Sequence, residues 1–277
     1  MNFTKQVLKD FAKLCNVAYL PSEKVQENFS ARPYNKDDHC SVFYNCDQSP
    51  KLYSRARDSQ MYVCRYNGML SITFRGTESA RDIITDLNIF QVKMPIKYMT
   101  EDNLPEVHWG FFNQFTELKP DMDEVINQYR KEETQGTKEI IFSGHSLGGA
   151  LATISALNYG MEYPDIHVNC VTFGSPRVGD EKFANYFDKI VKNSYRFVND
   201  NDPIPCIPTA WRYQHVKGCV WLHQDQVMNE STVWRGWRFF NNYILSFLGM
   251  GYDASQDHNC DGYCEDIKYL ENDLNTN

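Results

Sequence analysis

The residues best suited to covalent chemistry in this sequence are Gly144-His145-Ser146-Leu147-Gly148, which fit the pattern G-x-S-x-G. They follow a short apolar run at 138–143 and precede residues 147–160, which are mostly small or apolar and predict a buried helix. A serine on a sharp turn between a strand and a helix presents its hydroxyl for nucleophilic attack, and its flanking glycines allow strand and helix to approach. We therefore predict that Ser146 is a nucleophile rather than an N-cap serine on a glycine-rich turn.

Such a serine needs an acid that orients a base, and in folds built on this turn the chain order is serine, acid, histidine. Residues 194–200 predict a strand, and Asp200 and Asp202 lie in the turn that follows it. Asp202 precedes Pro203, which restricts the backbone of that turn. Spacing alone does not choose between the two aspartates, so we expect one to be catalytic and the other to be a structural turn residue.

Three histidines follow this turn and satisfy the expected order. His215 has the surroundings of a packed residue at a strand end. His223 closes the predicted strand 219–223, and His258 lies in a polar loop. Order alone leaves His223 and His258 both open as the base, whereas His145, adjacent to Ser146, should point away from it.

The remaining pattern predicts the elements that position these residues. Short apolar strands alternate with helices from residue 138 to residue 200, which is typical of a parallel sheet covered by helices on both faces. Residues 61–76 predict a hairpin that turns at Asn67-Gly68. The other expected features are a helix over 3–19, an irregular segment over 21–60, no long element over 78–107, a helix over 110–129 interrupted near Pro120, a strand over 218–223 and a buried aromatic helix over 234–250.

Composition excludes several classes of protein. The 277 residues carry 28 basic and 36 acidic side chains, and a net charge of −8 disfavours binding to nucleic acid. We find no linker, transmembrane stretch or signal-like apolar segment, so we expect one domain over 1–277. The odd number of cysteines, nine, excludes a fully paired disulfide framework. These features lead us to expect a cytoplasmic protein or one peripheral to a membrane, and they leave its oligomeric state open.

Six motifs occur in the order seen in class 3 lipases, the family of fungal triacylglycerol lipases, diacylglycerol lipases, plant phospholipases and feruloyl esterases. They are ITFRGTES, VHWGFF, GHSLGGALA, VTFGSPRVGD, FVNDNDPIPCIP and YQHVKGCVW, and the resemblance to the family extends over about residues 62–221. The resemblance implies an α/β-hydrolase fold with a mostly parallel central sheet and helices on both faces. It also implies a serine hydrolase that cleaves lipid esters, acylglycerols or phospholipids, through an acyl-enzyme and without a cofactor.

The resemblance also assigns roles to individual residues. Asp202 matches the family's acid, and His258 lies in a loop like the one that carries the family's base. Fifty-six positions separate Ser146 from Asp202, and the same number separates Asp202 from His258, which is a usual spacing in the family. Thr77 and Leu147 match the residues whose backbone N–H groups form the oxyanion hole.

In the family, the segment after the oxyanion residue is a lid, and here it corresponds to residues 78–97. Its apolar residues would make one face that covers the site or contacts lipid, although a plain surface helix fits equally well. Two further alternatives remain for the chain: an esterase for soluble or aryl esters, and a binding or signalling protein on a lipase fold. A metal site at His258, Cys260 and Cys264 lacks an evident fourth ligand. Acyl-chain length and head-group preference do not follow from the sequence.

Overall fold

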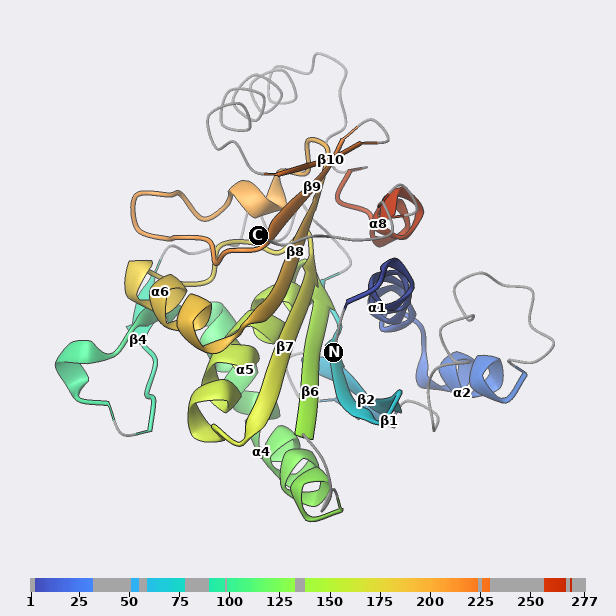
Figure 1. Cartoon of the computed structure of the whole chain (residues 1–277), viewed down its shortest axis with the longest axis horizontal. Helices are drawn as coiled ribbons and strands as arrows, with labels where there is room; N and C mark the ends of the chain where they lie inside the picture. The colour runs from blue at the N-terminus through green and yellow to red at the C-terminus, as the bar shows by residue number, and fades with distance from the viewer. Residues whose placement is uncertain are drawn as a thin grey trace.

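The computed structural model describes residues 3–31, 51–54, 59–77, 90–97, 99–132, 138–223, 226–229, 257–267 and 270. Within them, an eight-stranded sheet crosses the molecule in the order β1-β2-β3-β6-β7-β8-β9-β10 (Figure 1). Its strands are β1 (Lys51–Ser54), β2 (Gln60–Tyr66), β3 (Met69–Phe74), β6 (Lys138–His145), β7 (Ile166–Phe173), β8 (Asn193–Asn199), β9 (Cys219–His223) and β10 (Gln226–Asn229). Strands β3, β6, β7, β8 and β9 are parallel, and both edges of the sheet are antiparallel.

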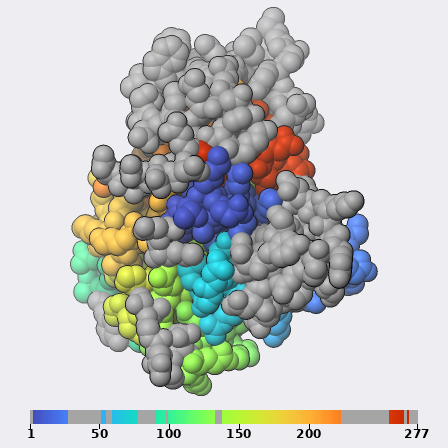
Figure 2. Space-filling model, turned by 45° about the vertical axis from the view of Figure 1, so that its right-hand side comes forward, coloured from blue at the N-terminus to red at the C-terminus, as the bar shows by residue number. Residues whose placement is uncertain are grey.

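Helices cover both faces of this sheet, as expected. On one face lie α4 (Trp109–Glu132), α5 (Leu147–Glu162) and α6 (Glu181–Ile190). On the other face lie α1 (Lys5–Val17) and α8 (Cys260–Asp266), which also pack against each other. Figure 2 shows α1 in dark blue beside α8 in red at the surface of the molecule. The prediction of an α/β-hydrolase fold with a mainly parallel sheet is confirmed.

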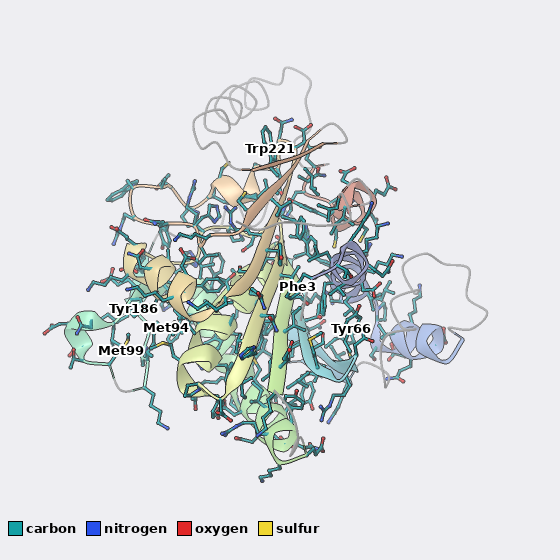
Figure 3. All side chains as sticks on the ribbon, viewed as in Figure 1. Phe3, Tyr66, Met94, Met99, Tyr186 and Trp221 are labelled. Atoms are coloured by element: carbon teal, nitrogen blue, oxygen red, sulfur yellow. The ribbon has the colours of Figure 1, made fainter. Side chains whose placement is uncertain are left out.

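The sheet separates two apolar clusters, and side chains alternate between them along each strand. On β6, Ile140 and Phe142 face the cluster under α5, whereas Ile141 faces the cluster under α1. Figure 3 labels Phe3 and Tyr66, which belong to the cluster on the α1 side of the sheet. Burial on both faces explains why Ile140, Ile141 and Phe142 are consecutive apolar residues on β6 instead of alternating with polar ones.

Several local predictions are confirmed with small changes in their limits. The hairpin β2–β3 turns at Asn67-Gly68, where φ is 48° and 80°, as a two-residue primed turn requires. The helix over 3–19 is α1. The segment 78–107 contains only β4 (Gln91–Lys93), β5 (Glu106–His108) and the short 3-10 turn Glu101–Asn103 among its described residues.

Two local predictions are wrong. Helix α4 runs without interruption through Pro120, because its six buried residues hold one continuous face against the core: Phe111, Phe115, Leu118, Met122, Ile126 and Tyr129. This packing outweighs the lost backbone hydrogen bond of the proline. The segment 21–60 is not wholly irregular, since it contains α2 (Ser22–Ala31) and β1.

Two predicted segments fall mainly or wholly outside the described residues. The first is the lid expected over 78–97, of which only residues 90–97 are described. The second is the aromatic helix over 234–250, which lies wholly outside the described residues. Among the helices that the structure does describe, none is both long and apolar enough to cross a membrane.

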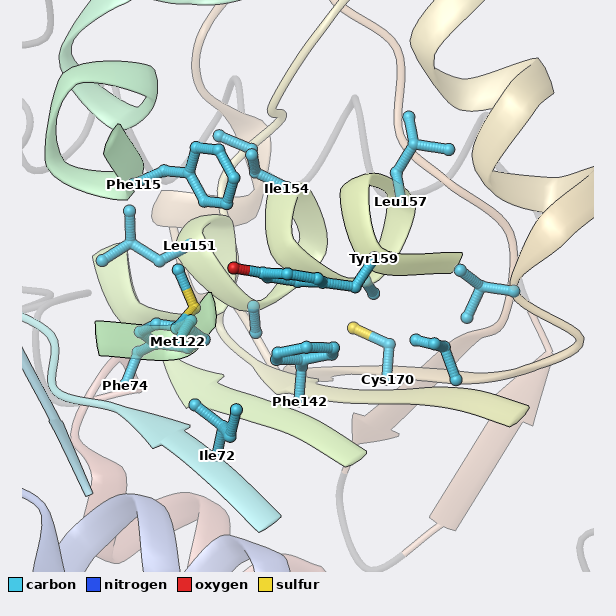
Figure 4. Close-up of a cluster of buried hydrophobic side chains, with 14 of the residues drawn as sticks. Ile72, Phe74, Phe115, Met122, Phe142, Leu151, Ile154, Leu157, Tyr159 and Cys170 are labelled. Atoms are coloured by element: carbon cyan, nitrogen blue, oxygen red, sulfur yellow. The ribbon is translucent and has the colours of Figure 1, made fainter. Parts of the chain in front are cut away.

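Phe142 lies on β6, the strand that leads to Ser146, and its ring is part of the cluster under α5 (Figure 4). Its ring stacks on Phe74 at 6.4 Å and on Tyr159 at 5.7 Å between centroids. We expect Phe142→Ala to lower the free energy of unfolding by about 3–5 kcal/mol, because it removes a fully buried ring and leaves a cavity. Chemical denaturation measures this change. Trp211→Ala is the control and should cost less than about 1 kcal/mol, since Trp211 is 75% exposed. Similar losses in the two variants would contradict the placement of Phe142.

Candidate active site

Ser146 occupies the turn between β6 and α5 and has an unusual backbone conformation. Its φ is 59° and its ψ is −127°, in a region that residues other than glycine rarely adopt. Its backbone N–H donates to the carbonyl of Phe173 on the neighbouring strand at 2.9 Å. Within the described part of the chain its side chain makes no capping bond to α5, which argues against an ordinary N-cap serine. The turn instead aims the hydroxyl away from the helix, as in a nucleophile elbow.

Glycines make this turn possible because backbone segments touch where side chains would otherwise stand. A Cβ on Gly144 would lie 2.2 Å from the carbonyl carbon and oxygen of Gly148. A Cβ on Gly148 would lie 2.3 Å from the carbonyl oxygen of Phe74, at the end of β3. Neither position accepts a side chain without moving backbone, so both glycines of the G-x-S-x-G pattern are required by packing.

The structure brings His258 to the serine. The Ser146 hydroxyl lies 2.8 Å from His258 Nε2, and His258 Nδ1 lies 2.9 Å and 2.8 Å from the two carboxylate oxygens of Asp202. Ser146, His258 and Asp202 are all buried. With Nδ1–H donating to the carboxylate, Nε2 is left as the acceptor of the serine proton. This is the geometry of a Ser-His-Asp triad.

The turn after β8 gives the two aspartates different positions. The Asp202 carboxylate accepts the backbone N–H of Ile204 at 2.9 Å and the Tyr263 hydroxyl at 2.5 Å, in addition to His258. Asp200 has a positive φ of 25°, and its carbonyl accepts the indole N–H of Trp221 at 2.9 Å. Asp200 is therefore a turn residue, and of the two aspartates it is Asp202 whose carboxylate contacts His258.

Gly174, at the end of β7, allows the acid and the base to meet. Its φ is 58°, and a Cβ there would lie 2.7 Å from the Asp202 carboxylate and 3.0 Å from the His258 ring. The glycine of the VTFGSP motif thus makes room for the Asp202–His258 pair. The sequence signalled this glycine only as part of a family motif.

The other candidate bases have different surroundings. His215 Nε2 lies 2.6 Å from the carbonyl of Pro205, so it is a packed residue as predicted. His223 ends β9, but its side chain lies outside what the structure describes.

His145 is buried beneath the base. Its Nε2 lies 2.8 Å from the backbone carbonyl oxygen of His258, and its Nδ1 lies 2.8 Å from the Tyr19 hydroxyl. Burial, and then the proximity of His258, hold the pKa of His145 well below its usual value. His145 is therefore neutral, and it contacts the base instead of the nucleophile.

The two expected oxyanion-hole residues flank the serine. Leu147 is the first residue of α5, where backbone N–H groups have no partner within the helix. Thr77 follows Gly76, whose backbone passes so close that a Cβ on it would lie 3.2 Å from the Ser146 Cβ. Leu147 and the segment that carries Thr77 therefore both lie next to Ser146.

Tyr263 and Tyr19 are the site residues that sequence reasoning missed. Tyr263 is buried on α8, and its hydroxyl accepts the backbone N–H of Asn199 at 2.9 Å while it donates to Asp202. A tyrosine five positions after the base, in an otherwise polar stretch, was the available signal. Tyr19 follows α1, more than a hundred residues from its partner His145, and its sequence surroundings contain no such signal.

Among the described residues, no group of three or more His, Cys, Asp or Glu side chains is arranged to hold a metal ion. The seven described cysteines are free thiols, including Cys260 and Cys264 on α8. Burial raises the pKa of the Cys170 thiol to about 12, and Cys15 is also raised by burial. These cysteines behave as small core residues.

The comparison with known proteins agrees with this site. The family described as lipase (class 3) matches residues 71–211, just over half of the chain. A secreted mono- and diacylglycerol lipase of Malassezia restricta is 28% identical over 210 residues, which are 70% of this chain and 65% of that protein. One from Fusarium solani is 28% identical over 163 residues, 58% of this chain and 46% of that protein. The native Rhizomucor miehei lipase propeptide complex is similar with a TM-score of 0.67 and 25% identity, covering 81% of this chain and 72% of that one.

These relatives correct one expectation. Several of them are named secreted lipases, which contradicts the cytoplasmic location inferred from the cysteine count and the missing apolar segment. The cysteine argument failed because buried free thiols are core residues and do not report the redox state of a compartment.

The chain spans about half the length of the curated relatives that it matches. The matched range nevertheless includes Thr77, Ser146 and Asp202, and the sheet and the elbow are those that the family motifs imply. This chain belongs to the class 3 lipase family.

Proposed function

We propose that the protein hydrolyses carboxylic esters of lipids through a Ser146-His258-Asp202 triad. One observation carries the proposal: an unbroken chain of hydrogen bonds runs from the serine hydroxyl through the imidazole to a carboxylate, inside a buried site. Family membership supports the same chemistry, and the relatives above are named lipases.

The chemistry proceeds in two steps. His258 Nε2 takes the Ser146 proton as Oγ attacks the ester carbonyl, and the same proton passes to the departing alcohol as the acyl-enzyme forms. Water then attacks the acyl-enzyme, giving its proton to His258, and the serine is regenerated as the carboxylic acid leaves. Asp202 holds the imidazole and stabilises its protonated form in both steps.

The backbone N–H groups of Leu147 and Thr77 are proposed to stabilise the negative oxygen of each tetrahedral intermediate. Leu147 directly follows Ser146 at the start of α5, and Gly76, the residue before Thr77, passes close to the Ser146 Cβ, which supports this proposal. The positive end of the α5 dipole adds to this stabilisation, since Ser146 stands at the helix N-terminus. Loss of one such donor typically costs about 3 kcal/mol of barrier.

The surface favours a lipid aggregate over a dissolved ester. Phe90, Trp109 and Trp211 are the large apolar side chains that are exposed among the described residues, at 64%, 48% and 75%. Their segments are joined, because the Phe90 carbonyl accepts the Trp109 N–H at 2.9 Å and the Gln91 side chain donates to the Arg212 carbonyl at 2.9 Å. Exposed aromatic rings of this kind suit a lipid–water interface. We propose that acylglycerols or phospholipids are presented there.

An activated serine is the first testable consequence. A fluorophosphonate should add once to the protein, at Ser146, and Ser146→Ala should abolish the adduct and lower ester hydrolysis at least about a thousandfold. Intact-mass spectrometry detects the adduct. The matched control is Ser175→Ala, which removes a buried hydroxyl bonded only locally, to the Pro176 carbonyl, and should label normally. Adducts that persist in Ser146→Ala would contradict the assignment. A folded wild-type protein that never labels, even with detergent micelles, would favour a binding protein.

The identity of the base is tested by substitution of the two histidines. His258→Ala should lose hydrolysis to nearly the same extent as Ser146→Ala, because members of a triad act as one unit. His223→Ala should keep most of its activity. Steady-state assays on a soluble ester decide between them, and retained activity in His258→Ala would assign the base to His223.

Tyr263 is expected to position the acid. Tyr263→Phe removes one of the donors to Asp202 and should lower kcat about tenfold with little change in KM, the rate equivalent of one hydrogen bond to a charged group. Tyr213→Phe is the control, because it removes a tyrosine hydroxyl that donates to the Phe90 carbonyl at 3.4 Å. Equal kcat in the two variants would show that Asp202 does not depend on this contact.

The lipid substrate is tested at the solubility limit. The rate on a short-chain acylglycerol should rise sharply as the substrate aggregates, and replacing Trp109 and Trp211 together by serine should reduce that rise but preserve the rate on dissolved substrate. A wild-type rate that saturates below the solubility limit would instead indicate an esterase for soluble esters.

A further inference from the structure

The turn after α1 reaches into the site through one hydroxyl. Tyr19 lies where the helix ends, and its backbone N–H donates to the Asn16 carbonyl at 3.0 Å. From there its ring meets the His145 ring edge-on, with centroids 5.9 Å apart, and its hydroxyl lies 2.8 Å from His145 Nδ1. This contact bridges 126 positions of the chain.

The chemistry of these groups determines which atom carries each proton. A carbonyl oxygen only accepts, so His145 Nε2, at 2.8 Å from the His258 carbonyl, must be the protonated nitrogen. His145 is neutral, and its Nδ1 is therefore a lone pair that accepts the Tyr19 O–H. Every hydrogen bond then runs one way, from Tyr19 to His145 and from His145 to the backbone of the base.

On its other side, the Tyr19 hydroxyl lies against Gly76, in the segment that leads from β3 to Thr77. A Cβ on Gly76 would lie 2.3 Å from Tyr19 Oη and 2.5 Å from the His145 carbonyl. The backbone of Gly76 therefore passes directly beside this hydroxyl. One phenol oxygen thus contacts both the segment beside the oxyanion hole and the histidine that holds the base.

Helix α1 is itself fixed to the helix that follows the base. It packs against α8, and the Asn16 side chain donates to Asp261. Tyr19 therefore extends from an anchored element, which allows it to define a position instead of following its partners.

We propose that Tyr19 is a positioning residue, whose hydroxyl selects the His145 tautomer that holds the His258 backbone and so sets the base against Ser146. This inference rests on the proposed hydrolase function, because it concerns the same base. It assigns a part in the reaction to the turn after α1, which lies outside the range matched by the family.

The test deletes two hydroxyls, one at a time: that of Tyr19 in the turn after α1, and that of Tyr62 on β2, which contacts the same turn. Tyr19→Phe removes the donor to His145, and Tyr62→Phe removes a hydroxyl that donates to the Leu20 carbonyl at 2.9 Å without touching His145. We expect Tyr19→Phe to lower kcat on a soluble ester about tenfold with KM unchanged, and to slow fluorophosphonate labelling by a similar factor. Tyr62→Phe should leave both rates unchanged. Equal effects in the two variants, or none in Tyr19→Phe, would overturn the proposal.

A second pair of variants is informative even if Tyr19→Phe folds poorly. His145→Gln keeps one amide donor for the His258 carbonyl and one acceptor for Tyr19, whereas His145→Leu keeps neither. We expect the glutamine variant to retain clearly more kcat than the leucine variant. Equal losses would mean that His145 only fills space.

Nitrogen NMR of histidine-labelled Ser146→Ala protein tests the hydrogen bonds of His145 without any hydrolysis. The His145 ring should show a single neutral tautomer protonated at Nε2, and the added change Tyr19→Phe should give mixed tautomers. If the wild-type protein had no esterase activity, the proposed function would be wrong, but this spectrum would still test the hydrogen bonds from Tyr19 to His145 and from His145 to the His258 carbonyl. If the wild-type protein were active but Tyr19→Phe left the His145 spectrum unchanged, only the role proposed for Tyr19 would be contradicted.

Discussion

The turn at Ser146 is the constraint on which the rest of the site depends. A backbone with φ of 59° at a residue with a side chain costs on the order of 1–3 kcal/mol and persists only where its surroundings hold it. Here β6 is buried on both faces before the turn, and α5 is buried after it, so the turn cannot relax without disrupting two apolar clusters. The core therefore maintains the conformation that exposes the serine hydroxyl to its base.

Around this turn, chain segments approach to backbone contact. Gly148 touches the end of β3, Gly76 touches the His145 carbonyl, and Gly174 touches the acid and the base. At each contact a Cβ would collide with a neighbour that cannot move easily, since two of these neighbours are backbone carbonyls and the third is the Asp202–His258 pair. The position of the nucleophile, the oxyanion segment and the acid–base pair are thus consequences of one tightly packed edge of the sheet, where the parallel strands end.

What could be predicted from sequence follows the range of the interactions involved. The nucleophile, the hairpin at Asn67-Gly68 and the parallel sheet depend on residues close together in the chain, and local pattern was sufficient for them. The choice of Asp202 over Asp200 depends on a positive φ and on contacts with α8, neither of which is visible in the string NDNDP. His258 over His223 was decided by family resemblance and not by chain order. The break expected at Pro120 failed because burial of one face of α4 overrides a local preference.

The two faces of the sheet contribute differently to the site. The face under α4, α5 and α6 supplies apolar packing behind the elbow, as the stacked rings of Phe74, Phe142 and Tyr159 show. The face under α1 and α8 supplies the polar contacts: Tyr263 bonds to the acid, and Tyr19 bonds to the histidine beneath the base. Hydrogen bonds to the acid and base are directional, so they hold the angle between imidazole and serine more sharply than apolar packing does. Because α1 and α8 pack on each other and α1 also packs against β6, the acid, the base and the strand that leads to the nucleophile share this support. A displacement of that pair of helices would therefore change the alignment of His258 with Ser146.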